Sequence, residues 1–228
     1  MSLNLGNTQI KDIYLGGTKI KEAYLGSSKV YSSLAPSTEW VNLGSTEYSR
    51  AGGSSSTVHY SLTGMPSTSA YNYFTIIFDG YLASGNGGAA DIYLENSSNG
   101  TMWRMRVHYR SSYPGFVSID NNVTAYSVAS GAPSQSTMSL DSHTYYYCSS
   151  KWTKGSYSRF KLVFDRNAKI CYIYIGGTLL GTATLNVDPI TISKFGLLSE
   201  QGRSYEVAKM KNIKVAGFTT LAAAQAWS

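Results

Sequence analysis

The sequence predicts an all-β fold, an antiparallel β-sandwich or jelly roll with a small β-repeat region before it and a short helix after it. Of 228 residues, 43% are hydrophobic and only 14% are charged, which is enough apolar material for a core. Short strand-like runs follow one another with turn signals between them and no helical segments, as in sandwiches. A ten-residue repeat occupies the N-terminus.

Residues 5–34 divide into three consecutive tens, LGNTQIKDIY, LGGTKIKEAY and LGSSKVYSSL, and a partial copy begins at Leu43. Glycine followed by Asn, Gly or Ser predicts a tight turn, and the remainder of each unit suits one short strand, so the repeats predict a small meander or a short solenoid. About thirty residues bury no core of their own. We therefore expect residues 1–34 either to pack on the rest of the chain or to anchor and oligomerise it, through Ile10, Ile13, Tyr14, Ile20, Tyr24, Leu25 and Val30.

The phrase IYLGGTKIKEAYLGSSKVY resembles the short N-terminal repeats of tail- and fibre-type structural proteins of bacteriophages. The resemblance implies a virion protein made in bacterial cytoplasm, with other virion proteins as partners. Because fibres of that kind are commonly trimeric, it also implies a homo-oligomer, with a trimer favoured. The N-terminus has no basic segment followed by an apolar one, so no signal peptide is expected. No run approaches 18 apolar residues, so no membrane span is expected and the protein is expected to be soluble.

Residues 35–56 are rich in Ser and Gly and contain Pro36, which predicts a linker. The sandwich is then expected over 57–217. Its strand-like runs are Val58–Leu62, Tyr73–Phe78, Asp91–Glu95, Met102–Tyr109, Phe116–Asp120, Val123–Val128, Thr144–Cys148, Arg159–Phe164, Lys169–Ile175, Thr178–Leu185, Ile192–Leu198 and Tyr205–Val215.

A two-residue period is clear in Arg159–Phe164, where alternate apolar side chains are expected on one face. An Asp165-containing turn follows, then an apolar strand, a Gly176-Gly177 hairpin turn and a further strand. This succession resembles the concanavalin A-like (laminin-G-type) jelly roll, roughly over residues 55–217. The resemblance implies the fold but no single function, because that family includes lectins, glycan-binding modules, glycosidases and adhesion domains.

The tail, residues 218–228, is the one helix-like segment. Thr219 or Thr220 is expected to cap a two-turn helix, with Leu221 and Trp227 packed on the body. Of the two cysteines, Cys171 lies in an apolar strand pattern and is expected to be a buried free thiol, with no disulfide to Cys148.

No catalytic residues are expected. Glycosidases of this fold have paired carboxylates, usually in a Glu-x-Asp-x-x-Glu phrase, and that phrase is absent here. Asp91 and Glu95 share one strand face but lie too far apart for a tight pair, and Glu200 and Glu206 are expected to be solvated. An enzyme is therefore the least favoured interpretation.

No metal or other cofactor is expected either. Asp120-Asn121-Asn122, and Asp79 with Asn86, are oxygen-rich groups of the kind that hold Ca²⁺ on loops. Turns rich in Asp and Asn are far commoner than calcium sites, and the three histidines have no ligand spacing.

The strongest charged feature is the run from Trp103 to Arg110. Alternation places Trp103, Met105, Val107 and Tyr109 in the core and forms a basic strip on the opposite face. The strip is expected either to be a solvated sheet face or to contact an anionic glycan or an acidic neighbour; its members are Arg104, Arg106, His108 and Arg110. Nucleic acid is not expected, because the net charge is only +6 and no nucleic-acid motif accompanies it.

A cluster of aromatic residues is the best carbohydrate-like signal, since sugars stack on aromatic rings. Tyr145, Tyr147 and Trp152 are candidate ligand contacts, with Tyr157 nearby, although packing in the core is the favoured explanation. The resulting hypothesis is a virion fibre, appendage or capsid decoration that displays a lectin-like domain to host-surface glycans. A purely architectural virion protein is the alternative, with a polysaccharide-degrading enzyme a distant third.

Overall fold

The computed structural model describes residues 4–5, 8–9, 13–15, 18–20, 22–25, 28–32 and 37–228, except 53–54, 67–70, 86–87, 99, 109–114, 119–122, 129–136, 141–142 and 148–150. For the strands before residue 38 and between residues 109 and 150, only the backbone is described. The chain divides into two compact units, residues 1–37 and 38–228.

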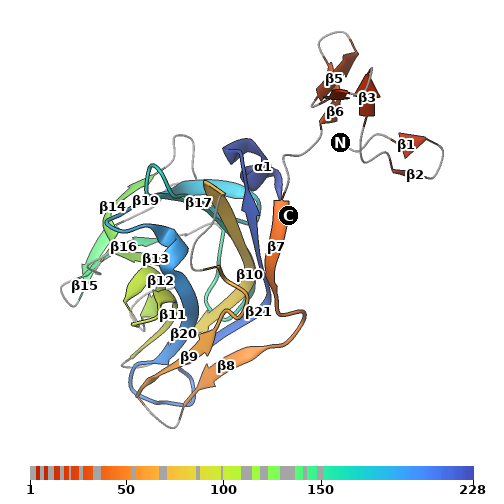
Figure 1. Cartoon of the computed structure of the whole chain (residues 1–228). Helices are drawn as coiled ribbons and strands as arrows, with labels where there is room; N and C mark the ends of the chain where they lie inside the picture. The colour runs from red at the N-terminus through yellow and green to blue at the C-terminus, as the bar shows by residue number, and fades with distance from the viewer. Residues whose placement is uncertain are drawn as a thin grey trace. The chain divides into compact units, whose positions relative to one another are not determined.

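Three β-hairpins make up the N-terminal unit (Figure 1). Their strands are β1 (Asn4–Leu5), β2 (Thr8–Gln9), β3 (Ile13–Leu15), β4 (Thr18–Ile20), β5 (Glu22–Leu25) and β6 (Ser28–Ser32). Leu5 pairs with Thr8, Leu15 with Thr18 and Leu25 with Ser28, so the first and last residues of each Leu-Gly-x-Thr/Ser phrase face each other across a hairpin.

The expected meander is replaced by three separate two-stranded sheets. The second and third hairpins each begin at the end of one ten-residue unit and finish within the next, whereas the first begins at Asn4, before the first unit. Of the residues predicted to anchor or oligomerise the chain, Ile10 lies outside the described residues. The others lie on hairpin strands, namely Ile13, Tyr14, Ile20, Tyr24, Leu25 and Val30.

The second unit is an antiparallel β-sandwich, as the sequence predicts. One sheet has eight strands in the order β14-β19-β18-β17-β10-β21-β7, with β8 also paired to β21, and the other has seven in the order β15-β16-β13-β12-β11-β20-β9. The eight-stranded sheet contains β7 (Ser37–Asn42), β8 (Tyr48–Ala51), β10 (Tyr73–Ala83), β14 (Val123–Val128), β17 (Tyr157–Asp165), β18 (Ile170–Ile175), β19 (Thr178–Leu185) and β21 (Val207–Phe218). The seven-stranded sheet contains β9 (Thr57–Ser61), β11 (Ala89–Asn96), β12 (Thr101–His108), β13 (Gly115–Ser118), β15 (Thr137–Leu140), β16 (His143–Tyr147) and β20 (Ile192–Ser199).

The segment 35–56, predicted to be a linker, instead contributes β7 and β8 to the sandwich. Trp40 explains why β7 is held there. Its ring packs 5.8 Å from that of Phe74 and lies so close to Gly217 that a Cβ at 217 would come within 2.2 Å of it. The neighbouring Val41 is 2% exposed. The sandwich therefore begins about twenty residues earlier than predicted.

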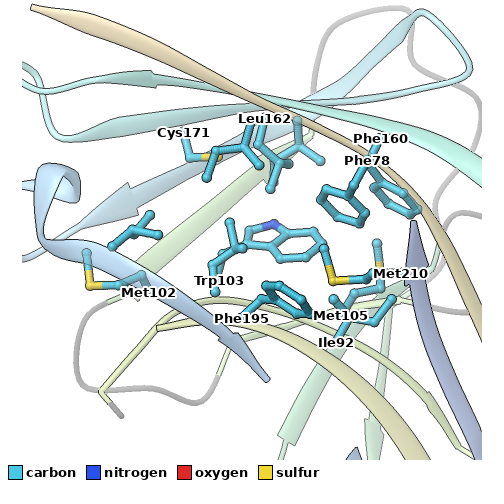
Figure 2. Close-up of a cluster of buried hydrophobic side chains, with 14 of the residues drawn as sticks. Phe78, Ile92, Met102, Trp103, Met105, Phe160, Leu162, Cys171, Phe195 and Met210 are labelled. Carbon is cyan, nitrogen blue, oxygen red and sulfur yellow. The ribbon is translucent and has the colours of Figure 1, made fainter. Parts of the chain in front are cut away.

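Aromatic side chains from both sheets fill the core (Figure 2). Phe78 stacks on Phe160 with ring centroids 5.0 Å apart, and Trp103, from the facing sheet, meets both rings edge-on at 6.0 Å. The predicted alternation in β17 is confirmed, since Phe160, Leu162 and Phe164 are fully buried. Cys171 is a buried free thiol, as predicted, and burial raises its pKa.

The Gly176-Gly177 turn and the C-terminal helix also follow the prediction. Gly176 and Gly177 both have positive φ, as a two-residue hairpin turn requires. A 3₁₀ turn, η1 (Pro189–Thr191), precedes β20. Helix α1 (Leu221–Ala226) is capped by the Thr220 hydroxyl, which accepts a hydrogen bond from the Ala223 amide. No helix in the described part of the chain is both long and apolar enough to cross a membrane.

Candidate functional site

The predicted basic strip lies on β12, on the face of the seven-stranded sheet that points away from the core. Alternation is confirmed, because Trp103, Met105 and Val107 are buried in the core. The expected solvated face is not found: Arg104 is 8% exposed, Arg106 4% and His108 3%. Arg110 lies outside the described residues. The strip is therefore a buried polar layer rather than an open cationic surface.

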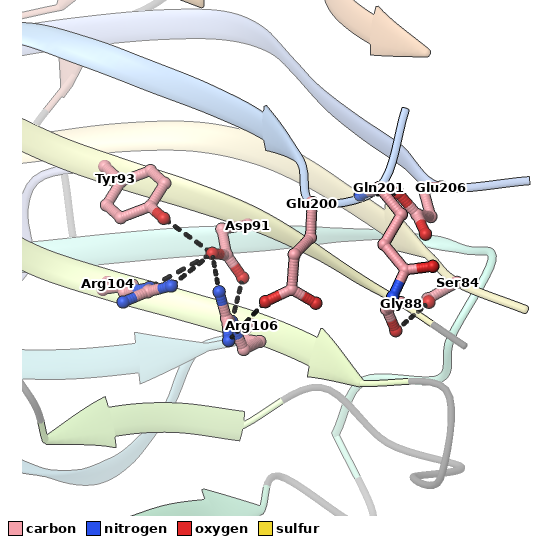
Figure 3. Close-up of polar contacts among 9 residues, drawn as sticks. All are labelled: Ser84, Gly88, Asp91, Tyr93, Arg104, Arg106, Glu200, Gln201 and Glu206. Atoms are coloured by element: carbon pink, nitrogen blue, oxygen red, sulfur yellow. Dashed lines mark hydrogen bonds and ion pairs between the residues drawn. The ribbon is translucent and has the colours of Figure 1, made fainter. Parts of the chain in front are cut away.

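Asp91, on the neighbouring strand β11, explains how two guanidinium groups are accommodated there (Figure 3). Its Oδ2 accepts hydrogen bonds from Arg104 Nη2 at 2.6 Å and from the Tyr93 hydroxyl at 2.7 Å. Its Oδ1 accepts one from Arg106 Nε at 2.6 Å. Arg106 also forms an ion pair with Glu200 at 3.3 Å. Within the described part of the strip, two cations thus face two carboxylates, and their charges balance.

The electrostatics of this network follow from burial and charge. Burial alone would raise the pKa of Asp91, but the charges of Arg104 and Arg106 and their hydrogen bonds lower it to about 2. Burial, together with the adjacent Asp91 charge, raises the pKa of the Tyr93 hydroxyl. The Arg104 guanidinium lies 4.7 Å over the Tyr93 ring. Asp91 is thus ionised at neutral pH and serves as the counter-ion of the network.

A second polar pair lies on the same sheet face. Glu95 Oε2 is 2.7 Å from His59 Nδ1, and the His59 side chain is 33% exposed while that of Glu95 is 4% exposed. Asp91 and Glu95 share a face of β11, as predicted, but each is engaged by its own partners. Such an arrangement holds neighbouring strands together.

Glu206, expected to be solvated, is fully buried. One carboxylate oxygen accepts hydrogen bonds from the Ser199 hydroxyl at 3.0 Å and from the Gln201 amide at 2.7 Å. Glu200 matches the expectation better, with a side chain that is 38% exposed. Burial of a carboxylate with hydrogen-bond donors around it is not visible in a sequence, because the donors come from backbone geometry.

Nor does a metal cluster form in the described part of the chain, where no group of three or more His, Cys, Asp and Glu side chains converges. Asp79 is bound to Arg159 at 3.1 Å and to Asn212 at 2.5 Å. Asn86 and the Asp120–Asn122 group, the other candidates, lie outside the described residues.

The predicted aromatic candidates lie on different parts of the chain. Tyr145 and Tyr147 lie on β16, for which only the backbone is described. Trp152 is 2% exposed and packs edge-on against Phe160 at 4.7 Å, so its ring offers no open face to a sugar. Its Nε1 donates to the Ser156 carbonyl at 2.8 Å. Trp152 therefore anchors the loop that precedes β17, in agreement with the packing explanation.

Tyr157, by contrast, is only half-buried and pairs with Tyr81, its cross-strand neighbour on β10. The two rings lie 5.3 Å apart on the outer face of the eight-stranded sheet. Lys209 and Lys211 project from the adjacent strand β21, with ammonium groups 5.7 Å from the Tyr81 ring and 4.0 Å from the Tyr157 ring. We call these four residues, together with Glu47, the tyrosine platform.

Glu47 orders one side of the tyrosine platform. It accepts a short hydrogen bond from the Tyr157 hydroxyl and forms an ion pair with Lys209 at 3.0 Å. The hydrogen bond from Tyr157, followed by that from Lys209, lowers the pKa of the Glu47 carboxyl. Burial, followed by the bond to Glu47, raises the pKa of the Tyr157 hydroxyl. The rings and one lysine are thus held in place before any ligand arrives.

Sequence reasoning named only Tyr157 among these residues. Tyr81, Lys209 and Lys211 lie on strands whose two-residue period places them outward, so periodicity alone contains a signal for each side chain. Periodicity does not give the strand order. The rings and the lysines come together because β17, β10 and β21 are neighbours in the sheet.

No family model matches the chain, and no curated protein matches it. Among solved structures, galectin LEC-6 from Caenorhabditis elegans is 10% identical with a TM-score of 0.40, covering 72% of this chain and 95% of the galectin. Sheep galectin-11, in a complex with glycerol, is 5% identical with a TM-score of 0.39, covering 72% of this chain and 98% of its own.

The binding domain of botulinum neurotoxin DC, in complex with SialylT, is 13% identical with a TM-score of 0.42, covering 80% of this chain and 42% of its own. A sialidase is 10% identical with a TM-score of 0.45, and this chain spans only 17% of its length. Identities and TM-scores this low assign neither ligand nor activity. By its own strand order, the chain is an antiparallel β-sandwich preceded by a unit of three β-hairpins.

Proposed function

We propose that this chain is a structural component of a bacteriophage virion, a fibre, appendage or capsid decoration, whose sandwich binds host-surface glycans through the tyrosine platform. In this proposal the hairpin unit anchors the chain to other virion proteins or joins copies of it, with a trimer favoured. The chain acts by binding, not by catalysis.

The observation that carries the glycan half of the proposal is the Tyr81–Tyr157 pair. The half-buried Tyr81 ring, held 5.3 Å from that of Tyr157 on an outer sheet face, offers an apolar surface on which a sugar stacks its C–H groups. The Tyr81 hydroxyl and the ammonium groups of Lys209 and Lys211 supply hydrogen-bond donors at the rim of that surface. Aromatic surface with a small number of fixed polar groups around it is typical of ligand sites.

The second part of the proposal, that the hairpin unit anchors the sandwich, is supported by the separation of the chain into two compact units. The sandwich has a complete core of its own, whereas each two-stranded hairpin is marginal in water without a partner surface. A repeated element with unpaired strand edges is suited to joining other chains, because each edge presents backbone donors and acceptors.

A purely architectural role is the second candidate, and the buried layer around Asp91 favours it. Arg104, Arg106 and His108 are used within the fold instead of facing a ligand. In that case the sandwich would pack on virion neighbours and bind no sugar.

Two measurements test the proposal. A mass-spectrometric census of purified phage particles should contain the chain, and its absence from every particle fraction would contradict the virion role. The full-length oligomer, applied to an array of bacterial surface glycans, should bind a subset of them. Substitution Tyr81→Ala should remove that binding, whereas His59→Ala, on the opposite sheet, should leave it unchanged. Absence of any glycan binding by the intact oligomer would favour the architectural role.

A further inference from the structure

One lysine of the tyrosine platform, Lys211, differs from the two neighbouring cations Lys209 and Arg159 in having no carboxylate partner among the described residues. Lys209 is paired with Glu47 at 3.0 Å, and Arg159 is paired with Asp79 at 3.1 Å. Lys211 lies beside both pairs but forms no ion pair within the described part of the chain. Its ammonium group rests on the Tyr157 ring at 4.0 Å.

We propose that the tyrosine platform binds an acidic sugar, one whose ring lies on Tyr81 and whose single carboxylate meets Lys211. This inference rests on the proposed glycan-binding function and adds the chemical class of the ligand and the residue that selects it.

The charge balance of the tyrosine platform and the neighbouring Arg159–Asp79 pair supports one negative charge on the ligand. Lys209, Lys211 and Arg159 contribute three positive charges, and Glu47 and Asp79 contribute two negative ones, so one positive charge remains. The remaining charge is localised on Lys211, because the other two cations already have carboxylates within 3.1 Å. Charge complementarity of this kind discriminates between ligands more than it adds affinity.

The positions of the two rings also support a sugar that lies on Tyr81 and directs its carboxylate toward Lys211. The Tyr81 ring has less cation cover than the Tyr157 ring, since the ammonium of Lys209 is 5.7 Å from its centroid and is bound by Glu47. Tyr157 is covered by Lys211 at 4.0 Å. A pyranose on Tyr81 therefore has Tyr157 as its neighbour on one side, and a carboxylate that extends that way reaches the cation fixed above it.

Fixing Lys211 in advance also lowers the cost of binding. A free lysine loses side-chain entropy when it forms an ion pair, which is why exposed pairs contribute little. A cation already held over an aromatic ring has less freedom to lose. The two lysines therefore differ in role. Lys209 orders the tyrosine platform with Glu47, and Lys211 is available to a ligand.

The test compares two forms of one ligand on the full-length protein. Oligosaccharides of a uronic acid, and the same oligosaccharides after reduction of their carboxyl groups to hydroxymethyl groups, are titrated calorimetrically at low salt. The wild-type protein should bind the acidic form about tenfold more tightly, the effect of one charge-assisted contact. Lys211→Gln should remove that preference, so that the variant binds the two forms with equal affinity.

Lys194→Gln is the matched control, because it makes the same charge change on β20 of the other sheet. It should keep the tenfold preference. Equal binding of the two ligand forms by the wild-type protein, or a preference that survives in Lys211→Gln, would overturn the inference while leaving glycan binding intact. Failure of the wild-type protein to bind either form or any glycan on the array would overturn the proposed function itself, so the two failures are distinguishable.

Discussion

The Glu95 carboxylate reaches across an intervening strand to the His59 imidazole, with Oε2 and Nδ1 2.7 Å apart. Glu95 lies on β11 and His59 on β9, and β20 runs between them. The residue that lies between them on β20 is Gly196, which pairs with His59. A Cβ at position 196 would lie 2.9 Å from Glu95 Oε2 and 2.9 Å from the Thr57 methyl group. The polar pair therefore depends on the absence of a side chain at this position.

The first prediction follows from that contact. Gly196→Ala should destabilise the sandwich by about 1–3 kcal/mol, because the new methyl group displaces the Glu95 carboxylate from His59. Urea unfolding followed by tryptophan fluorescence measures the change. In a Glu95→Ala background the same substitution should cost less, since one of the two close contacts is gone. An equal cost in both backgrounds would show that the carboxylate is not the obstacle.

Acid stability should depend on Asp91. Its pKa is about 2 in the folded protein and has an ordinary value of 3.8, so its ionised form stabilises the fold above pH ~4. As the pH falls from about 4 to about 2, that contribution of about 2 kcal/mol should be lost. Urea midpoints measured at a series of pH values in this range test the expectation.

Asp91→Asn is the control for that titration. The variant should be less stable at neutral pH by about 3–5 kcal/mol, because Arg104 and Arg106 then lack their shared counter-ion. Its stability should fall less steeply than that of the wild type between pH 4 and pH 2. Parallel curves for the two proteins would mean that another carboxylate is responsible for the acid sensitivity.

Alternation and turn residues were sufficient to predict most of the sandwich. Val123–Val128 and Thr178–Leu185 have the predicted ends, and Gly176-Gly177 forms the predicted turn. The strands of residues 37–51 were missed because their Ser, Thr and Gly content is typical of loops. What places β7 in the sheet is the contact of Trp40 with Gly217, which lie far apart in the chain.

The candidate site was harder to predict, for a physical reason. The period of β12 correctly placed Arg104 and Arg106 on one face, but their burial depends on Asp91 in the neighbouring strand. Trp152 illustrates the opposite case: an aromatic residue in a polar loop suggests a ligand contact, yet its ring packs on Phe160. Strand order decides both outcomes, and a single sequence does not contain it.

Trp152 should accordingly matter for stability. Trp152→Ala should lower the free energy of unfolding by about 3–5 kcal/mol, the usual cost of deleting a buried aromatic side chain. Trp152→Phe retains a ring beside Phe160 and loses the 2.8 Å bond to the Ser156 carbonyl, so it should cost less. Both are measured by guanidinium unfolding. A Trp152→Ala variant as stable as the wild type would contradict the buried placement.

Removal of residues 1–34 should convert an oligomer into a monomer if the hairpins join copies of the chain. The sandwich retains its core and both sheets after this truncation, since they begin at β7. Light scattering coupled to gel filtration gives the molar mass of both proteins, and circular dichroism checks that the truncated chain is folded. Equal numbers of subunits in the two proteins would show that the hairpins do not oligomerise it.

The C-terminal helix should be held by a buried hydrogen bond from Thr75. The Thr75 hydroxyl, fully buried on β10, donates to the Ala224 carbonyl at 2.9 Å, and Lys161 Nζ donates to the Gln225 carbonyl at 2.6 Å. Thr75→Val keeps the side-chain shape and leaves the carbonyl without its donor, which should cost about 1–3 kcal/mol. Thr182→Val on β19 makes the same exchange where no such bond exists and should be nearly neutral. Amide hydrogen exchange should then show faster exchange in α1 for Thr75→Val alone, and unchanged exchange there would mean that the helix is held by its apolar contacts instead.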